Sequence, residues 1–184
     1  MIPLLAVEEA KRRGAEAGIR PDLAGVNAFR CLLNNLKLGG AVGNLLTTLL
    51  FEGSLDTRVR ELVILRTGWR TGSEYEFCQH VAIARRLKMS DEDILGVRAP
   101  ESCRSYNDID RAVIRLTDEL LEGTEISPST WNTLARVFEA PQLLELLAVT
   151  ANWRFFAVFL KAAEVPLDSG VASWPEGKAP QTRT

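Results

Sequence analysis

The segment of residues 56–87 limits the possible folds most, because it contains two helical patterns separated by a single short break. An Asp-Thr pair can cap a first helix that ends near Trp69, and Ser73 can open a second one. Between them, Thr71-Gly72 is long enough only for a turn. The sequence therefore predicts two adjacent antiparallel helices in this segment.

Helical patterns also dominate the rest of the chain, and no stretch shows the alternation expected of a strand. The sequence predicts an all-α fold, with a single domain over residues 1–165 and its core at about residues 38–165. Further helices are expected at about residues 4–16, 23–36, 42–51, 90–95, 108–121, 127–138 and 141–164, with Gly39-Gly40 as a break. The segment 166–184 is rich in Pro, Gly, Ser and Thr, so we expect a poorly ordered tail or an arm that lies on a neighbouring subunit.

Composition and charge narrow the classes of function. The chain has 184 residues and a net charge of -2, which gives no electrostatic reason to expect a nucleic-acid partner. Its longest apolar stretch, residues 143–160, is interrupted by Glu145, Asn152 and Arg154, so we expect no membrane span. Three widely spaced cysteines, in no Cys-x-x-Cys array, predict reduced thiols and a cytoplasmic location rather than a zinc site or disulfides.

The one histidine of the chain, His80, ends the stretch "TGSEYEFCQH", which also holds a cysteine and two glutamates. An α-helix advances about 100° per residue, so Cys78 points about 160° away from His80, whereas Glu76 lies on the same face as His80. A cysteine–histidine couple within this helix is therefore excluded, and Cys78 is interpreted as a packing thiol.

Glu61 lies near the middle of the apolar face of the preceding helix, where an unpartnered carboxylate costs several kcal/mol. His80 has the same problem on its own helix. Antiparallel packing of the two helices predicts that Glu61 and His80 pair, directly or through a water, and Glu76 can join them from one turn before His80.

Structural interpretations of these residues stay open beside the functional one. Ser73-x-x-Glu76 has the pattern of a capping box. A single histidine on an apolar face is more often a hydrogen-bonded core residue than a catalyst. One histidine and scattered acids make a poor ligand set for a transition metal, so we expect no metal site.

The stretch "RVRELVILRTGWRTGSEYEFCQHVAIARRLKMSDEDI" resembles the core of the carboxymuconolactone decarboxylase and alkylhydroperoxidase D-like superfamily. The flanking "VNAFRCLLNNLK" is similar to its lead-in helix and "LLELLAVTANWRFFAVFLKAAEVPL" to its last helix, and the resemblance covers about residues 38–166. The resemblance implies a compact helical bundle of the alkylhydroperoxidase D-like type. It also implies a homo-oligomer, a trimer or a hexamer, with active sites near subunit interfaces.

The hydroperoxidase branch of this superfamily carries a glutamate followed by Cys-x-x-Cys-x-x-x-His. Matched to that pattern, Glu61 and His80 hold the acid and histidine positions, and Ser73 and Glu76 stand where the two cysteines would be. Without a reactive thiolate and its resolving partner there is no sulfenic acid step and no disulfide to reduce. Thiol peroxidase activity is therefore not expected. An alternative description is a protein that is related to peroxidases through its superfamily alone.

The decarboxylase branch is similar in retaining an acid and the histidine without the cysteine pair. It implies a small-molecule substrate, a carboxylated lactone or related acid from aromatic catabolism, and no cofactor. Three catalytic groups are implied: His80 as proton donor and acceptor, Glu61 as the residue that fixes its tautomer, and Glu76 as a second relay group. The residues expected to contact the substrate are Arg58, Arg154, Trp69, Ser73 and Phe77, with the arginines on its carboxylates.

Two further alternatives stay open at this point. The same acid–histidine pair could serve another cofactor-free reaction, such as an isomerisation or a hydration, because a fold does not specify a substrate. In a different class, the protein is a non-catalytic helical oligomer in which Glu61–His80 is a buried polar clamp. Trp69, Phe77, Trp153 and Phe156 could line an apolar pocket, and for each of them core packing competes with that place.

Overall fold

The computed structural model describes residues 2–123 and 125–181, and these residues form helices, turns and loops without a strand. The predicted all-α class is therefore confirmed. In chain order the elements are α1 (Val7–Glu16), α2 (Pro21–Ala24), α3 (Asn27–Leu32), α4 (Leu36–Thr47), a π-helical turn η1 (Thr48–Glu52), α5 (Thr57–Thr71), α6 (Glu74–Arg86), α7 (Asp91–Gly96), a 3-10 turn η2 (Pro100–Ser102), α8 (Asp108–Glu122), α9 (Pro128–Leu134), α10 (Ala140–Ala162) and a 3-10 turn η3 (Pro175–Gly177).

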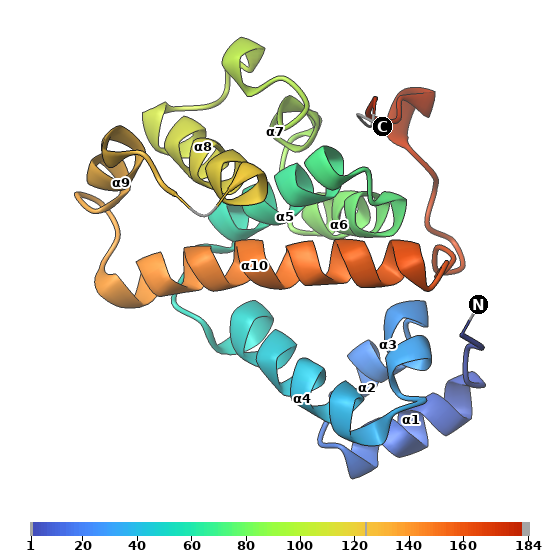
Figure 1. The fold of residues 1–184 in the computed structure, drawn as a ribbon. Coiled ribbons are helices and arrows are strands. Elements are labelled where there is room, and N and C mark those ends of the chain that lie inside the picture. The colour runs from blue at the N-terminus through green and yellow to red at the C-terminus, as the bar shows by residue number, and fades with distance from the viewer. Residues whose placement is uncertain (1, 124, 182–184) are drawn as a thin grey trace.

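The long helix α10 divides the molecule into two layers (Figure 1). Helices α1–α4 lie on one side of it, and α5–α8 lie on the other. One face of α10 is buried between them through Leu146, Val149, Trp153, Phe156 and Leu160. By length and hydropathy α10 could also cross a membrane, the one such helix among the described residues. Its packing between the two layers accounts for the apolar residues of its buried face.

Helices α5 and α6 form the antiparallel pair that the sequence predicts. Gly72 ends α5 in the left-handed conformation, with φ of 62°, which glycine adopts without strain. Gly68 faces the start of α6, where an added Cβ would lie 2.8 Å from the backbone nitrogen of Phe77. This close approach of the two helices places Glu61 of α5 opposite His80 of α6.

The predicted helix at residues 23–36 is wrong, because the chain forms two short helices, α2 and α3, instead. The carboxylate of Asp168 accepts a hydrogen bond from the backbone N–H of Asn27 at 2.7 Å and so caps α3 from the far end of the chain. The predicted break at Gly39-Gly40 is also wrong, since both glycines lie inside α4. There they allow close packing: a Cβ on Gly40 would lie 3.2 Å from the side chain of Ala17.

Residues 166–181 pack on the body of their own chain, so the predicted poor order of the tail requires correction for them, whereas its predicted place on a neighbouring subunit stays a prediction. Leu167, Val171 and Trp174 pack against a second core cluster, a group of buried apolar residues that includes Leu65 of α5, Phe77 of α6 and Ile94 of α7. Asp168 accepts hydrogen bonds from Tyr75 Oη at 3.0 Å and Gln79 Nε2 at 2.7 Å. Composition predicted the absence of regular structure, whereas tertiary contacts hold this segment in place; residues 182–184 lie outside the described residues.

Candidate active site

Glu61 and His80 make the contact that the sequence predicts. His80 Nδ1 lies 2.7 Å from Glu61 Oε2, across the α5–α6 interface. Glu61 has no exposed surface, and His80 is 6% exposed. The pair is therefore direct and buried, and each residue supplies the polar partner that the other requires.

Trp153 of α10 is the second partner of His80. Its indole Nε1–H donates to His80 Nε2 at 3.1 Å, and the two rings meet edge to face with centroids 5.5 Å apart. An indole nitrogen can only donate, so Nε2 must carry the free lone pair and Nδ1 must carry the proton. In this arrangement the Nδ1–H donates to the Glu61 carboxylate.

Glu76 lies one turn before His80, with Oε2 at 3.9 Å from His80 Nε2. It is 5% exposed. Burial is the main cause that raises the pKa of Glu76 from 4.5 to about 7; repulsion from Glu61 raises the pKa further, and a hydrogen bond from Trp153 lowers it. A carboxyl group in that range can both donate and accept a proton near neutral pH.

Arg60 is a buried member of the site that the sequence analysis did not identify. Its Nη1 donates to the carbonyl of Leu50 at 3.0 Å, and its Nη2 lies 3.5 Å from Glu61 Oε1. Helical projection places Arg60 on the polar arc of α5, away from Glu61. The projection misled because α5 is covered on all sides: every residue from 60 to 68 is buried.

A cavity of about 100 Å³ opens against this cluster, between α6 and α10 on one side and the N-terminal layer on the other. An engineered apolar cavity of about 150 Å³ binds benzene, so this smaller space limits a ligand to one small ring at most. Its polar lining comes from Tyr75, Glu76, Gln79 and His80. Its apolar lining comes from Leu23, Val26, Ala28, Phe29, Leu46, Leu50, Ile83, Trp153 and Phe156. No Lys or Arg of the described residues belongs to this lining.

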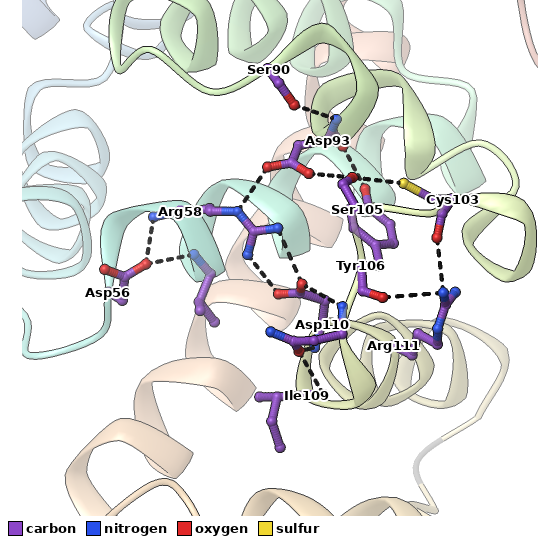
Figure 2. A network of polar contacts seen from close by, with 12 residues as sticks. Asp56, Arg58, Ser90, Asp93, Cys103, Ser105, Tyr106, Ile109, Asp110 and Arg111 are labelled. Atoms are coloured by element: carbon purple, nitrogen blue, oxygen red, sulfur yellow. Dashed lines mark hydrogen bonds and ion pairs between the residues drawn. The ribbon is translucent and has the colours of Figure 1, made fainter.

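The structure places Arg58 away from the cavity. Arg58 Nη1 and Nη2 donate to the two carboxylate oxygens of Asp110 at 2.6 and 3.1 Å, and Nε donates to Asp93 at 2.9 Å (Figure 2). All three nitrogens are thus engaged in a clamp between α5, α7 and α8. The predicted role of Arg58 on a substrate carboxylate does not fit this arrangement, because the guanidinium already has two carboxylate partners.

The other residues expected to contact a substrate also lie outside the cavity lining. Arg154 is exposed and donates to the carbonyl of Leu120 at 3.2 Å. Trp69 and Phe77 pack against each other at 5.6 Å, and both pack against Trp174 of the C-terminal segment. The positions of Trp69 and Phe77 on their helices could not predict this contact, because Trp174 comes from the C-terminal segment, which packs against the second core cluster.

Ser73 corrects the capping interpretation. Its hydroxyl makes no cap hydrogen bond to α6, and Oγ is buried without a hydrogen-bond partner among the described residues. Cys78 agrees with its predicted role as a packing thiol: it lies in the second core cluster, and burial raises the pKa of its thiol to about 12. Neither residue lines the cavity beside His80.

Comparisons with known proteins agree with this architecture. Residues 37–119 match the Carboxymuconolactone decarboxylase family. The debrominase Bmp8 is similar over 92% of each chain, with a TM-score of 0.76 and 16% identity. An uncharacterized peroxidase-related protein with an alkylhydroperoxidase AhpD core, from Ralstonia eutropha JMP134, has a TM-score of 0.74 at 18% identity, over 92% of this chain and 91% of that one.

A third solved structure, an uncharacterized peroxidase-related protein from Silicibacter sp. TM1040, has a TM-score of 0.74 at 13% identity and covers 89% of this chain and 85% of its own. A search of curated proteins finds no significant match. At these identities the structural similarities establish the fold, and the activities of the neighbours belong to those proteins.

Proposed function

We propose that this chain is a member of the carboxymuconolactone decarboxylase and alkylhydroperoxidase D-like superfamily and an acid–base enzyme that needs no cofactor. Its substrate in this proposal is one small ring compound, a lactone or related acid. The observation that carries the proposal is Glu76, a buried carboxyl group with a pKa of about 7 that lines an apolar cavity beside the Glu61–His80 pair.

In the decarboxylase form of the proposal, the bond between the ring and the carboxylate carbon breaks. The electron pair enters the conjugated lactone and forms a dienolate, and the carboxylate leaves as carbon dioxide. A proton held by the Glu76 and His80 group is then delivered to the dienolate carbon, so that charge and atoms balance. Glu61 keeps the imidazole oriented throughout.

The absence of a cation in the described cavity lining is compatible with this chemistry. A carboxylate that enters an apolar cavity without a cation loses its hydration, and that loss is relieved when the group departs as neutral carbon dioxide. Arg58 and Arg154 therefore have no part in the proposal. The same lining favours a substrate with one carboxylate over a substrate with several, because each further buried charge would lack a partner.

A thiol peroxidase is the weaker alternative on this scaffold. Ser73 and Glu76 occupy the two cysteine positions of the hydroperoxidase pattern, and no cysteine lines the cavity. All three cysteines are buried free thiols. A reducing, cytoplasmic location is part of our proposal, and this buried free-thiol state is compatible with it.

A homo-oligomer, a trimer or a hexamer, is also part of the proposal. The face of α10 that points away from the core carries Leu144, Phe155 and Val158, which are 66%, 42% and 64% exposed. Large apolar side chains at heptad-like spacing on one helix are typical of a helix–helix contact between subunits. Sedimentation at micromolar concentration tests this, and a species of only 20.4 kDa would contradict it.

The proposed activity is tested with a panel of five- and six-membered lactones, each with and without a ring carboxylate, by following carbon dioxide release and proton uptake. Turnover by the wild type and its loss in Glu76→Gln support the proposal. The non-catalytic clamp is the correct description if no compound of the panel binds or turns over and Glu76→Gln changes only stability. Glu92→Gln, the same substitution at an exposed glutamate of α7, is the matched control.

A further inference from the structure

We infer that Trp153 is a positioning residue of this site. Its indole N–H holds His80 neutral with the proton on Nδ1, and so leaves Glu76 as the group that exchanges a proton with a ligand in the cavity. This inference rests on the proposed function for its catalytic meaning. Its structural content, the protonation state of His80, can be tested without a substrate.

The geometry gives Trp153 this role because both nitrogens of His80 are engaged inside the protein. Nδ1 contacts Glu61 at 2.7 Å, and Nε2 accepts the indole N–H of Trp153 at 3.1 Å. A second proton on His80 would put an N–H at Nε2, facing the N–H of Trp153. Two donors would then oppose each other in a buried site, and the hydrogen bond would be lost.

Trp153 is held firmly enough to impose this constraint. It is 1% exposed and packs against Phe156 with ring centroids 6.4 Å apart. It lies in the middle of α10, the helix that both layers cover. The indole therefore cannot turn its N–H away from His80 without disturbing the core.

The remaining titratable residues of the cavity wall leave one group for exchange with a ligand. Three such residues line the cavity: Tyr75, Glu76 and His80. The hydroxyl of Tyr75 donates to Asp168 at 3.0 Å and accepts the backbone N–H of Ala28 at 3.2 Å. A hydrogen bond from Trp153 also reaches Glu76, which is the one carboxyl group among the described lining residues, so a ligand in the cavity meets this carboxyl group.

Nuclear magnetic resonance of the ring nitrogens tests the inference, because the chain has a single histidine. At pH 7 we expect the wild type to show one protonated nitrogen, Nδ1, and one nitrogen with a free lone pair, Nε2. In Trp153→Phe the Nε2 signal should move toward the protonated position, because no donor then opposes a second proton. The control Trp131→Phe, on α9, should leave both signals unchanged.

Unchanged nitrogen signals in a folded Trp153→Phe protein would overturn the inference and leave Trp153 as a packing residue. If that variant does not fold, the wild type decides the question. A scalar coupling between Trp153 Nε1 and His80 Nε2, transmitted through the hydrogen bond, is expected. Its absence, with both signals assigned, would equally overturn the inference.

These measurements contain no substrate, so their outcome is independent of whether the lactone panel is turned over. For a compound that is turned over, Trp153→Phe should lower kcat about tenfold, the equivalent of one buried hydrogen bond. It should also change the dependence of the rate on pH, from a curve that reports one titrating group to a curve that reports two. The second group would be His80, which then competes with Glu76 for the proton. A purely structural role would leave the shape of that profile unchanged.

Discussion

Helix α5 carries two polar clusters within one turn of each other, and they differ in how completely their groups are paired. Arg58 forms three short hydrogen bonds to Asp110 and Asp93, and the bond to Asp110 above all raises its pKa beyond the usual value (Figure 2). Glu61, one turn later, has a single close contact with His80. Arg60 beside it leaves Nε buried without a hydrogen-bond partner among the described residues.

The difference separates a structural network from a site that can do chemistry. A fully paired buried network has no proton to give and no lone pair to offer, so it stabilises one arrangement of helices. The cluster around His80 lines a cavity and holds one carboxyl group with a pKa of about 7. The His80 cluster is therefore the functional candidate, because its polar groups are incompletely paired and lie beside a cavity. The number of charged residues alone would not distinguish it from the Arg58 cluster.

The largest effects on activity are expected for Glu76→Gln, which removes the exchangeable carboxyl group, and for His80→Gln. His80→Gln keeps the size and a hydrogen-bonding amide but removes the imidazole that Glu61 and Trp153 hold beside Glu76, and each variant should lose about 100- to 10,000-fold in activity. Glu61→Gln should fall between these variants and the wild type, because it keeps the contact and loses the charge. Steady-state rates on one substrate of the lactone panel measure all three, with circular dichroism to confirm the fold.

Asp110→Ala should produce the opposite pattern, a large loss of stability with little loss of activity per folded molecule. The carboxylate is 3% exposed, binds Arg58 and caps α8 through the backbone N–H of Asn107. Removing it leaves the guanidinium without its main partner, at a cost of about 2–4 kcal/mol in the free energy of unfolding. Urea denaturation measures the loss. An equal loss in specific activity would show that the two clusters are not separable.

Glu76→Gln should change how stability depends on pH. The folded protein holds the Glu76 proton up to about pH 7, whereas an unfolded carboxyl releases it near 4.5, so the wild type loses free energy of unfolding as the pH rises between these values. The amide does not titrate. The variant should therefore be more stable than the wild type by about 1–3 kcal/mol at pH 8 and nearly equal to it at pH 4. Urea titrations at both pH values check the sign; a wild type that gains more stability than the variant on going from pH 5 to 8 would refute it.

The smallest effect on activity is expected for Cys78→Ala. The thiol is buried in the second core cluster, and its raised pKa of about 12 keeps it protonated. Activity should stay within a few-fold of the wild type, with a loss of about 1 kcal/mol in stability from the smaller side chain. An inactive Cys78→Ala beside an active His80→Gln would reverse the assignment of acid–base chemistry.

Sequence reasoning was most successful where one helix face decides the outcome. The apolar arcs around Glu61 and His80 predicted their contact, because a buried carboxylate and a buried imidazole each require a partner. Cys78 was excluded for the same geometric reason. No such constraint applied to Arg58 and Arg154, which were predicted to bind a substrate carboxylate. In the structure Arg58 binds Asp110, and Arg154 donates to the carbonyl of Leu120.

Three features of the site had no local signal. Trp153 was a candidate for the pocket wall, but its hydrogen bond to His80 comes from α10, 73 residues away in the chain, and was not predicted. Arg60 is buried although it lies on the face of α5 that carries charged residues, a face that the sequence suggests is exposed. Asp168 lies in a segment whose composition predicts no order, yet it caps α3 and holds Tyr75 and Gln79 in the cavity wall.

The sequence by itself determined the helical class, the α5–α6 hairpin and the acid–histidine pair, since periodicity and the cost of buried charge act within one or two turns of helix. The tertiary structure decided the rest: the cavity, the tautomer of His80, the pKa of Glu76 and the ordered course of residues 166–181. Each of these depends on groups brought together from distant parts of the chain. Desolvation and hydrogen-bond partners are properties of that assembled environment, and no local pattern encodes them.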